Sequence, residues 1–402
     1  MGTTSPYRNY PTYETADGRR FGQEEEAAVL RVIRSGHLSR VGGTETIALE
    51  SEFAQLMGMP HAVASATGSA AIHCAVAALD LEPGDEIIVP PITDAGSMIG
   101  ALAQGLVPVF ADVDPKTGCL TAESVAAAIT ERTRVVVVVH LFGGAADVEA
   151  ITELCHRRGI RVIEDCAQAY LATTPSGALV GTVGDIGCFS LQQSKHITTG
   201  DGGLLVTADA GLARRAALFA DKGWPRDTGE RTHLFLGLNY RMTDLVAAVA
   251  RAQLGKVSEV VADRRRIAEG WSTALRRPGV SVPDAERHSF WLYPLVLEPA
   301  VVGGTNRDLV ELLADTGLSA SAGYLQRVLY RNPVLTERRT FGSSGWPLSL
   351  ASRPAPECPV AEDLVRSSLV TVGINENFTP DDAAAAAAAL GSALDELALR
   401  KD

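Results

Sequence analysis

Short apolar runs alternate with amphipathic segments along the chain between about residues 60 and 210. The amphipathic segments carry apolar residues at three- and four-residue spacing, which predicts helices at Ser69–Leu79, Ala122–Ile129 and Val148–Arg158. The apolar runs predict strands at Glu86–Pro90, Val107–Val113, Arg134–His140, Ile160–Asp165, Asp185–Leu191 and Gly203–Thr207. Such alternation is typical of a parallel sheet wrapped by helices. The run Val135–Val139 is apolar throughout, so we expect it at the middle of a sheet that is covered on both faces.

The pattern of hydrophobic and polar residues changes in the last third of the chain. Thr243 is a suitable N-cap for a long helix over residues 243–275, which Gly255 and Gly270 interrupt. Beyond it, we expect a smaller α+β domain from the following segments: His288–Pro299, a helix from Asn306, the run Leu369–Ile374 and an Ala-rich helix from Asp381. The Pro-, Gly- and Ser-rich segment Arg331–Pro356 is typical of a long loop. We therefore predict a large domain at 1–280, with an N-terminal arm at about 1–35, and a small domain at 281–402.

The amino-acid composition limits the kinds of binding partner that we expect. The 402 residues are 46% hydrophobic, which is enough for a large core, and the formal net charge is −12. Nucleic acids and anionic membranes need clustered Lys and Arg, and the sequence has no basic tract, so we expect a small-molecule partner. No apolar run approaches the roughly 18 residues of a spanning helix, and we expect a cytoplasmic protein.

Cysteine and histidine spacing does not indicate a metal site. The six cysteines show no C-x-x-C spacing and several lie in apolar runs, which predicts buried free thiols. The histidines make neither an H-x-x-x-H nor an H-E-x-x-H pattern, so we expect no bound metal.

Three polar features follow predicted strands, and ligands bind beside the carboxyl ends of strands in such sheets. Gly68, Ser69 and Ala70 open a helix whose free N–H groups suit a phosphate. VIEDCAQAY places Asp165 at a strand end, where a carboxylate keeps a heteroaromatic nitrogen protonated, and Gln168 lies three residues on. FSLQQSKHITTGDGG places Lys195 among short polar residues after another strand.

Each feature also has an ordinary explanation: a capped core helix, a surface ion pair or a solvated lysine. Together they describe a pyridoxal-phosphate site, with a phosphate cradle, an acid for the ring nitrogen and a nucleophilic lysine.

At this point the sequence resembles the DegT-type sugar aminotransferases, which are pyridoxal-phosphate enzymes of the aspartate aminotransferase superfold (fold type I). The resemblance runs from about Gly36 to Phe378 through SGHLSRVGGTETIALE, GSAAIHCAV, PGDEIIVPP, VVVVHLFGG, VIEDCAQAY, FSLQQSKHITTGDGG and LGLNYRM. It implies an α/β fold, with a mostly parallel seven-stranded sheet in the large domain and a smaller C-terminal α+β domain.

The resemblance also implies roles for individual residues. Lys195 would hold the cofactor as a Schiff base and move protons, and Asp165 would pair with the pyridine nitrogen. Gln168 would lie near the pyridoxal hydroxyl. Gly68, Ser69, Ala70 and Ser190 would bind the phosphate on their own subunit. Asn239 would reach the phosphate of the neighbouring subunit, which implies a homodimer with shared active sites.

Two departures from the family pattern concern the substrate. PPITDAGS has Asp94 where relatives place an aromatic side chain that stacks on the cofactor. Asp94 suits either a helix cap or a contact to a substrate hydroxyl. AGYLQRVLYRNP lacks a histidine that many relatives carry but keeps Tyr324 and Gln326, which we take with Asp94 as candidate substrate residues.

These observations favour an aminotransferase that moves an amino group from glutamate or glutamine to a keto-sugar or keto-cyclitol. SLQQSK and the glutamine-rich site resemble the glutamine:ketocyclitol aminotransferases of aminoglycoside antibiotic biosynthesis, which are close relatives. The alternatives are a pyridoxal-phosphate lyase or dehydratase acting on a sugar, and a non-catalytic regulatory homologue. Family members that act as sugar dehydratases replace the lysine with histidine, whereas Lys195 is retained here. An NAD-binding oxidoreductase is disfavoured because no G-x-G-x-x-G follows the first strand.

Overall fold

A seven-stranded sheet forms the centre of the larger part of the molecule. The structure is a computed structural model, and it describes residues 8–352, 354 and 357–400. The sheet has the order β1-β7-β6-β5-β4-β2-β3, in which β7 is antiparallel to both neighbours and the other pairs are parallel. The predicted mostly parallel seven-stranded sheet is therefore confirmed. Its strands are β1 His61–Ser65, β2 Glu86–Val89, β3 Val107–Phe110, β4 Thr133–Val139, β5 Arg161–Asp165, β6 Ile186–Ser190 and β7 Gly203–Thr207.

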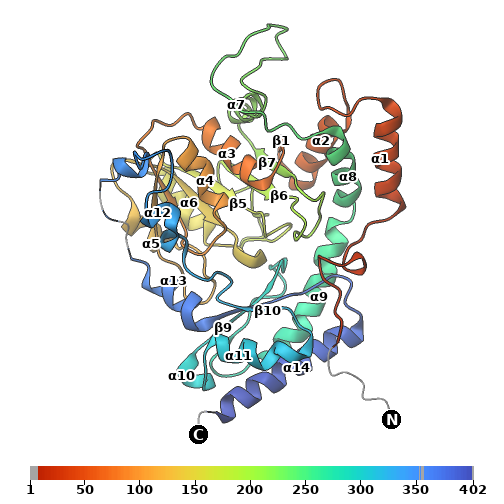
Figure 1. The fold of residues 1–402 in the computed structure, drawn as a ribbon, viewed down its shortest axis with the longest axis vertical. Helices are drawn as coiled ribbons and strands as arrows, with labels where there is room; N and C mark the ends of the chain where they lie inside the picture. The colour runs from red at the N-terminus through yellow and green to blue at the C-terminus, as the bar shows by residue number, and fades with distance from the viewer. Residues whose placement is uncertain (1–7, 353, 355–356, 401–402) are drawn as a thin grey trace.

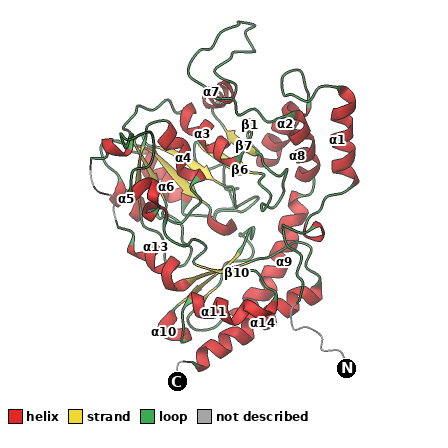
Figure 2. Ribbon diagram, viewed as in Figure 1, coloured by secondary structure: helices red, strands yellow, loops and turns green. Residues whose placement is uncertain are grey.

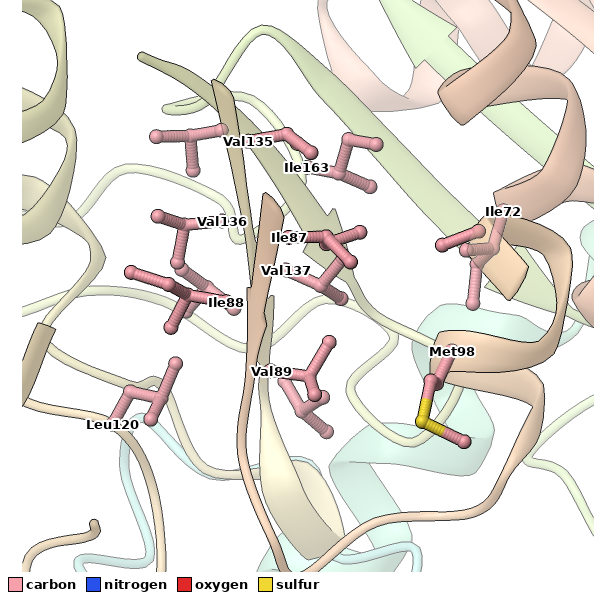
Figure 3. Close-up of a cluster of buried hydrophobic side chains, with 14 of the residues drawn as sticks. Ile72, Ile87, Ile88, Val89, Met98, Leu120, Val135, Val136, Val137 and Ile163 are labelled. Atoms are coloured by element: carbon pink, nitrogen blue, oxygen red, sulfur yellow. The ribbon is translucent and has the colours of Figure 1, made fainter. Parts of the chain in front are cut away.

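Helices cover both faces of this sheet (Figure 2). Figure 3 shows Ile87 and Val137 pointing toward Ile72 and Met98, which come from helices on one face, while Ile88 and Val136 point to the opposite face. Val135 to Val138 have no measurable exposure, as the continuous apolar run predicts for a central strand. The helices of this part are α1 Gln23–Ser35, α2 Glu45–Met57, α3 Gly68–Ala78, α4 Gly96–Ala103, α5 Ala122–Ala128, α6 Val148–His156 and α7 Ala210–Ala220.

A second, antiparallel sheet lies beside the first and has its own core (Figure 1). Its order is β10-β11-β9-β8, with β8 Val280–Ser281, β9 Tyr293–Leu297, β10 Ala320–Ala322 and β11 Leu369–Val372. The helices of this part are α10 Pro299–Val302, α11 Asn306–Leu313, α13 Pro359–Asp363 and α14 Pro380–Leu399. This arrangement is the α+β architecture that we expected from the last third of the chain. The domain boundary at residue 280 stays a prediction.

The long helix predicted over residues 243–275 is two helices, α8 Asp244–Leu254 and α9 Val257–Leu275. The chain turns at Gly255 and Lys256, where the Lys256 ammonium reaches both the carboxylate of Glu25 and the carbonyl of Arg20. Gly270 does not interrupt α9, contrary to the prediction. Its neighbour Trp271 is buried in the second core, and such packing outweighs the low helix propensity of one glycine.

The segment predicted as a long loop at Arg331–Pro356 contains one short α-helix among its described residues, α12 Pro333–Thr336. Just before it, Tyr330 packs on Phe110 of the edge strand β3, with ring centroids 5.4 Å apart. Leu348 belongs, with Tyr330 and Phe110, to the hydrophobic core around the seven-stranded sheet. The six cysteines are free and buried, as predicted. Among the helices described, none combines the length and the apolar character needed to cross a bilayer.

Candidate active site

Lys195 lies in the loop after β6 and is only partly exposed. Its Nζ is 3.9 Å from the centroid of the Trp291 ring. Burial lowers the pKa of Lys195 to about 8, although the charges of Asp165 and Asp94 act in the opposite direction. A lysine with this pKa is deprotonated to a useful extent near neutral pH, so it can act as a nucleophile and as a proton carrier.

Asp165 ends β5 and is buried beside the lysine. Its Oδ2 accepts a hydrogen bond from Ser97 Oγ at 2.6 Å, and its Oδ1 accepts one from the Ala167 N–H at 3.1 Å. Burial raises the pKa of Asp165, while these hydrogen bonds and the Lys195 charge lower it. A cationic ring nitrogen beside this carboxylate would offset the burial cost and keep it ionised.

The first turn of α3 is the segment for which we predict a phosphate site. Thr67 caps the helix, because its Oγ1 accepts from the Ala70 N–H at 3.0 Å. The N–H groups of Gly68 and Ser69 have no hydrogen-bond partner within the described part of the chain. A Cβ on Gly68 would lie 2.6 Å from Ser190 Cβ, so only glycine lets the serine approach this turn. Two free N–H donors and the Ser190 hydroxyl thus fit a phosphate, whereas the Ala70 donor is occupied.

Gln168 and Tyr324 connect the end of β5 to the second sheet. Gln168 Oε1 accepts from the Phe142 N–H at 2.7 Å, and Gln168 Nε2 donates to the Tyr324 hydroxyl at 3.2 Å. The Tyr324 ring lies edge-on to Phe142 and to Trp291, with centroid distances of 5.0 and 6.0 Å. Burial raises the pKa of Tyr324, so its hydroxyl stays protonated. The candidate substrate residue Tyr324 therefore lies next to the candidate cofactor residues.

Asp94, Gln326 and Asn239 are exposed. Asp94 precedes Ala95, the N-cap residue of α4, and its Oδ1 accepts from the N–H of Gly96, the first residue of that helix, at 2.7 Å. Its charge also affects the pKa values of Lys195 and Tyr324, so the carboxylate lies near both. Gln326, by contrast, lines a separate surface depression with arginine side chains, apart from the cleft that Tyr324 lines.

A cleft of about 610 Å³ opens beside Ser194, Trp291 and Tyr324. Hydroxyl groups are frequent in its lining, which includes Thr12, Tyr13, Ser319, Ser321 and Thr371. Its arginine, Arg264, is already paired with Glu376 at 2.6 Å, and both side chains are 2% exposed. The cleft therefore offers hydroxyl groups more than free positive charge.

Three contributors to the site were not predicted from the sequence: Ser97, Trp291 and Arg19. Trp291 stands in an apolar run, HSFWLYPLVL, that gives no sign of a contact with Lys195. Ser97 is the last residue of the quoted motif PPITDAGS, and its hydroxyl is the signal that could have indicated a partner for a buried carboxylate.

His140, Glu164 and Cys166 place potential metal-binding atoms within 4.8 Å of one another. Their hydrogen bonds account for this cluster without an ion. His140 Nδ1 accepts from the Ala146 N–H, so Nε2 carries the proton and donates to Glu164 at 2.9 Å. The Glu164 carboxylate also accepts from the N–H groups of Gly181, Val183 and Gly184. This carboxylate holds the turn between β5 and β6.

The sheet topology, the buried carboxylate, the lysine and the N–H cradle define a pyridoxal-phosphate enzyme with the aminotransferase fold. The chain matches the DegT/DnrJ/EryC1/StrS aminotransferase family over residues 19–390, and it belongs to this family. It is a pyridoxal-phosphate-dependent aminotransferase.

Similar proteins are named for different substrates and products. The chain is 34% identical to an L-glutamine:2-deoxy-scyllo-inosose aminotransferase of Streptomyces lividus over 387 residues, which cover 91% of each chain. It is 37% identical to a GDP-perosamine synthase of Caulobacter vibrioides over 307 residues, which cover 75% of this chain and 81% of the relative. The crystal structure of 3-amino-5-hydroxybenzoic acid synthase superposes with a TM-score of 0.80 at 30% identity, covering 94% of this chain and 97% of that one.

Proposed function

We propose that this enzyme transfers an amino group from L-glutamate or L-glutamine to a keto-cyclitol or keto-sugar in the biosynthesis of an aminoglycoside-like secondary metabolite. The observation that carries the proposal is the pairing of a lysine of lowered pKa, Lys195, with the buried carboxylate of Asp165. Relatives named for glutamine and a cyclitol ketone, at 34 to 37% identity, support the choice of donor and acceptor.

The cofactor, when bound, would supply an aldehyde carbon that takes up the amino group and an electron-withdrawing ring that stabilises negative charge on the reacting carbon. Lys195 Nζ would take a proton from the carbon that loses the amino group and deliver a proton to the carbon that receives it. Asp165 holds the ring nitrogen protonated, and the N–H groups of Gly68 and Ser69 together with the Ser190 hydroxyl bind the phosphate. Gln168 orients the edge of the cofactor ring, because hydrogen bonds to the Phe142 N–H and the Tyr324 hydroxyl fix its own side-chain amide.

The acceptor is a ring with several hydroxyl groups. The cleft beside Trp291 and Tyr324 is lined by serine, threonine and tyrosine hydroxyls, which can exchange hydrogen bonds with such a ring. Within this lining the Arg264 guanidinium is neutralised by Glu376 and is not free for a phosphate. These features suit the keto-cyclitol and the sugar portion of a keto-sugar.

Two half-reactions test the proposal. Purified enzyme loaded with pyridoxal phosphate is mixed with L-glutamine or L-glutamate alone, and the cofactor absorbance is followed; conversion to the aminated cofactor supports transamination. The aminated enzyme is then challenged with keto-cyclitols and nucleotide-linked keto-sugars, and recovery of the original spectrum identifies the acceptor. Failure of both donors to aminate the cofactor, with water loss from a sugar instead, would establish a dehydratase.

We also propose that the enzyme is a homodimer with shared sites. A long loop between α7 and α8, residues 222–238, projects from the body of the molecule (green in Figure 1). Leu234 and Leu236 on this loop are 50% and 88% exposed, and apolar side chains on a projection suit contact with a second subunit. Asn239 follows directly at the base of the loop, where it bridges to Asp221 and is itself exposed.

Asn239→Ala should weaken cofactor retention, because the amide would no longer reach the phosphate in the neighbouring subunit. The test mixes this variant with Lys195→Ala protomers and measures turnover. A mixed dimer contains one site with both native residues, so activity should rise above that of the Asn239→Ala homodimer. Wild-type protomers mixed with Lys195→Ala give the reference for subunit exchange. If exchange occurs and no activity is recovered, the sites are not shared.

Asp94→Ala should impair the acceptor half-reaction while donor amination stays within about twofold, if the free carboxylate oxygen of Asp94 binds an acceptor hydroxyl. The hydrogen bond from the Gly96 N–H to Asp94 at the start of α4 predicts a separate, smaller effect, a loss of about 1 kcal/mol in the free energy of unfolding. Both half-reactions and a denaturation curve are measured on the same preparation.

A matched control for that variant is Thr121→Ala. The Thr121 hydroxyl caps α5 by accepting a hydrogen bond from the Ser124 N–H. Because α5 carries no candidate site residue, loss of this cap should lower the stability and leave both half-reactions unchanged. If Asp94→Ala behaves like Thr121→Ala, with both half-reactions intact, Asp94 is a helix cap and not a substrate residue.

A further inference from the structure

Three consecutive backbone carbonyls that lead to the lysine side chain are held by side chains from other parts of the chain. Arg19 Nη2 donates to the carbonyl of Gln193, and Arg19 Nη1 donates to that of Lys195 at 2.8 Å. Between them, the indole Nε1–H of Trp291 donates to the carbonyl of Ser194 at 2.8 Å. The backbone on which Lys195 is mounted is thus fixed by two donors that lie far from it in sequence.

Trp291 is itself held rigidly. Its backbone N–H donates to the carbonyl of Phe142 at 2.8 Å. Its own carbonyl accepts from Arg264 Nη1 at 3.1 Å, and Arg264 is locked in the buried pair with Glu376. The same ring that anchors Ser194 also lies under the Lys195 ammonium, which is attracted to the face of an aromatic ring.

Arg19 belongs to an N-terminal segment that is tied to the second sheet. Asn375 Nδ2 donates to the carbonyl of Gly18 at 3.0 Å, and Asn377 Nδ2 donates to that of Asp17 at 2.8 Å. The Arg19 side chain is 7% exposed, and burial lowers the pKa of Arg19 only to about 10, so it remains a cation that donates strongly at neutral pH.

We propose that Arg19 and Trp291 are positioning residues for Lys195, which clamp the carbonyls of residues 193–195 and thereby set where the lysine nitrogen lies. The inference rests on the proposed role of Lys195. Neither residue has to touch the substrate to act in this way. A loosened segment lets the lysine nitrogen sample positions away from the reacting carbon, and small displacements of a reacting group cost rate more than binding.

Covalent capture of the cofactor by the apoenzyme tests the clamp without turnover. Apoprotein is mixed with pyridoxal phosphate, quenched with borohydride at successive times, and the label on Lys195 is quantified by peptide mass spectrometry. Arg19→Met should slow capture at Lys195 about tenfold or more, and kcat should fall by a similar factor with the donor KM within about twofold. Arg19→Lys, which keeps the charge and can reach one carbonyl, should show a smaller loss.

The neighbouring arginine is the matched control. Arg20 points to the second sheet and α9, where it bonds Asn377 and Asp263, so Arg20→Met should leave the capture rate within about twofold. Trp291→Phe keeps a ring under the ammonium but removes the indole N–H, and it should slow capture about threefold. The Trp291→Phe variant also provides the test of the clamp if Arg19→Met does not fold.

Two results would overturn the clamp: capture by Arg19→Met and Trp291→Phe at the wild-type rate, or equal slowing in Arg19→Met and Arg20→Met. A wild-type label at a residue other than Lys195 would instead reject the proposed role of the lysine, so the two failures are distinguishable.

Discussion

Replacing Lys195 with alanine should reduce turnover by at least about 10⁴-fold, because one side chain both anchors the cofactor and carries the proton. The nitrogen is partly desolvated, its pKa is lowered to about 8, and alanine supplies neither a nucleophile nor a base. Turnover with a glutamine donor and the identified acceptor gives the rate. Borohydride-fixed cofactor, measured by mass, should also disappear from the variant.

Lys116→Ala is the matched control, since Lys116 is an exposed lysine in a surface turn. It should retain the wild-type rate and the wild-type mass after borohydride treatment. A Lys195→Ala enzyme that turns over at a rate close to wild type would refute the assignment of this site.

Replacing Asp165 with asparagine should slow amination by the donor about a hundredfold or more while pyridoxal phosphate still binds. The amide has nearly the shape of the carboxylate but carries no charge, so it does not hold a ring nitrogen protonated. Single-turnover amination, followed by cofactor absorbance at saturating donor, separates this effect from cofactor loss, which dialysis and mass measure independently.

Ser97→Ala tests whether the charge or the hydrogen bond of Asp165 matters. Ser97 Oγ lies 2.6 Å from Asp165 Oδ2, so alanine removes one hydrogen bond and leaves the carboxylate in place. We expect a loss of about tenfold or less. If Ser97→Ala and Asp165→Asn slow amination equally, the buried carboxylate acts through its hydrogen-bond geometry and not through its charge.

Hydrophobic patterning predicted the large sheet because both faces of a parallel sheet are buried. The strand β4 is apolar at Val135 through Val139, and no other placement would keep such a run out of water. Placing Asp165 and Lys195 after strands of one sheet then follows, because the carboxyl ends of parallel strands meet at the same edge. These residues could be chosen as candidates from the sequence.

Patterning correctly predicted the helix break at Gly255, but it wrongly predicted one at Gly270 and did not predict which hydrogen-bond donors are used. Gly255 and Gly270 look equivalent in the sequence, yet only the first ends a helix, because Trp271 packs into the second core and holds α9 together. Likewise Gly68, Ser69 and Ala70 all open α3, but the Thr67 hydroxyl occupies the Ala70 N–H. Local competition among hydrogen bonds decides such details.

The sequence by itself determined the type of fold and the choice of candidate cofactor residues, since both depend on local periodicity and on short segments that follow strands. The tertiary structure alone decided what surrounds Lys195. Arg19 and Trp291 contact it from segments that are far apart along the chain, and the Tyr324 ring lies edge-on to that of Trp291. Their side chains meet there because two sheets with separate cores pack side by side, and no local pattern records a contact that only this packing creates.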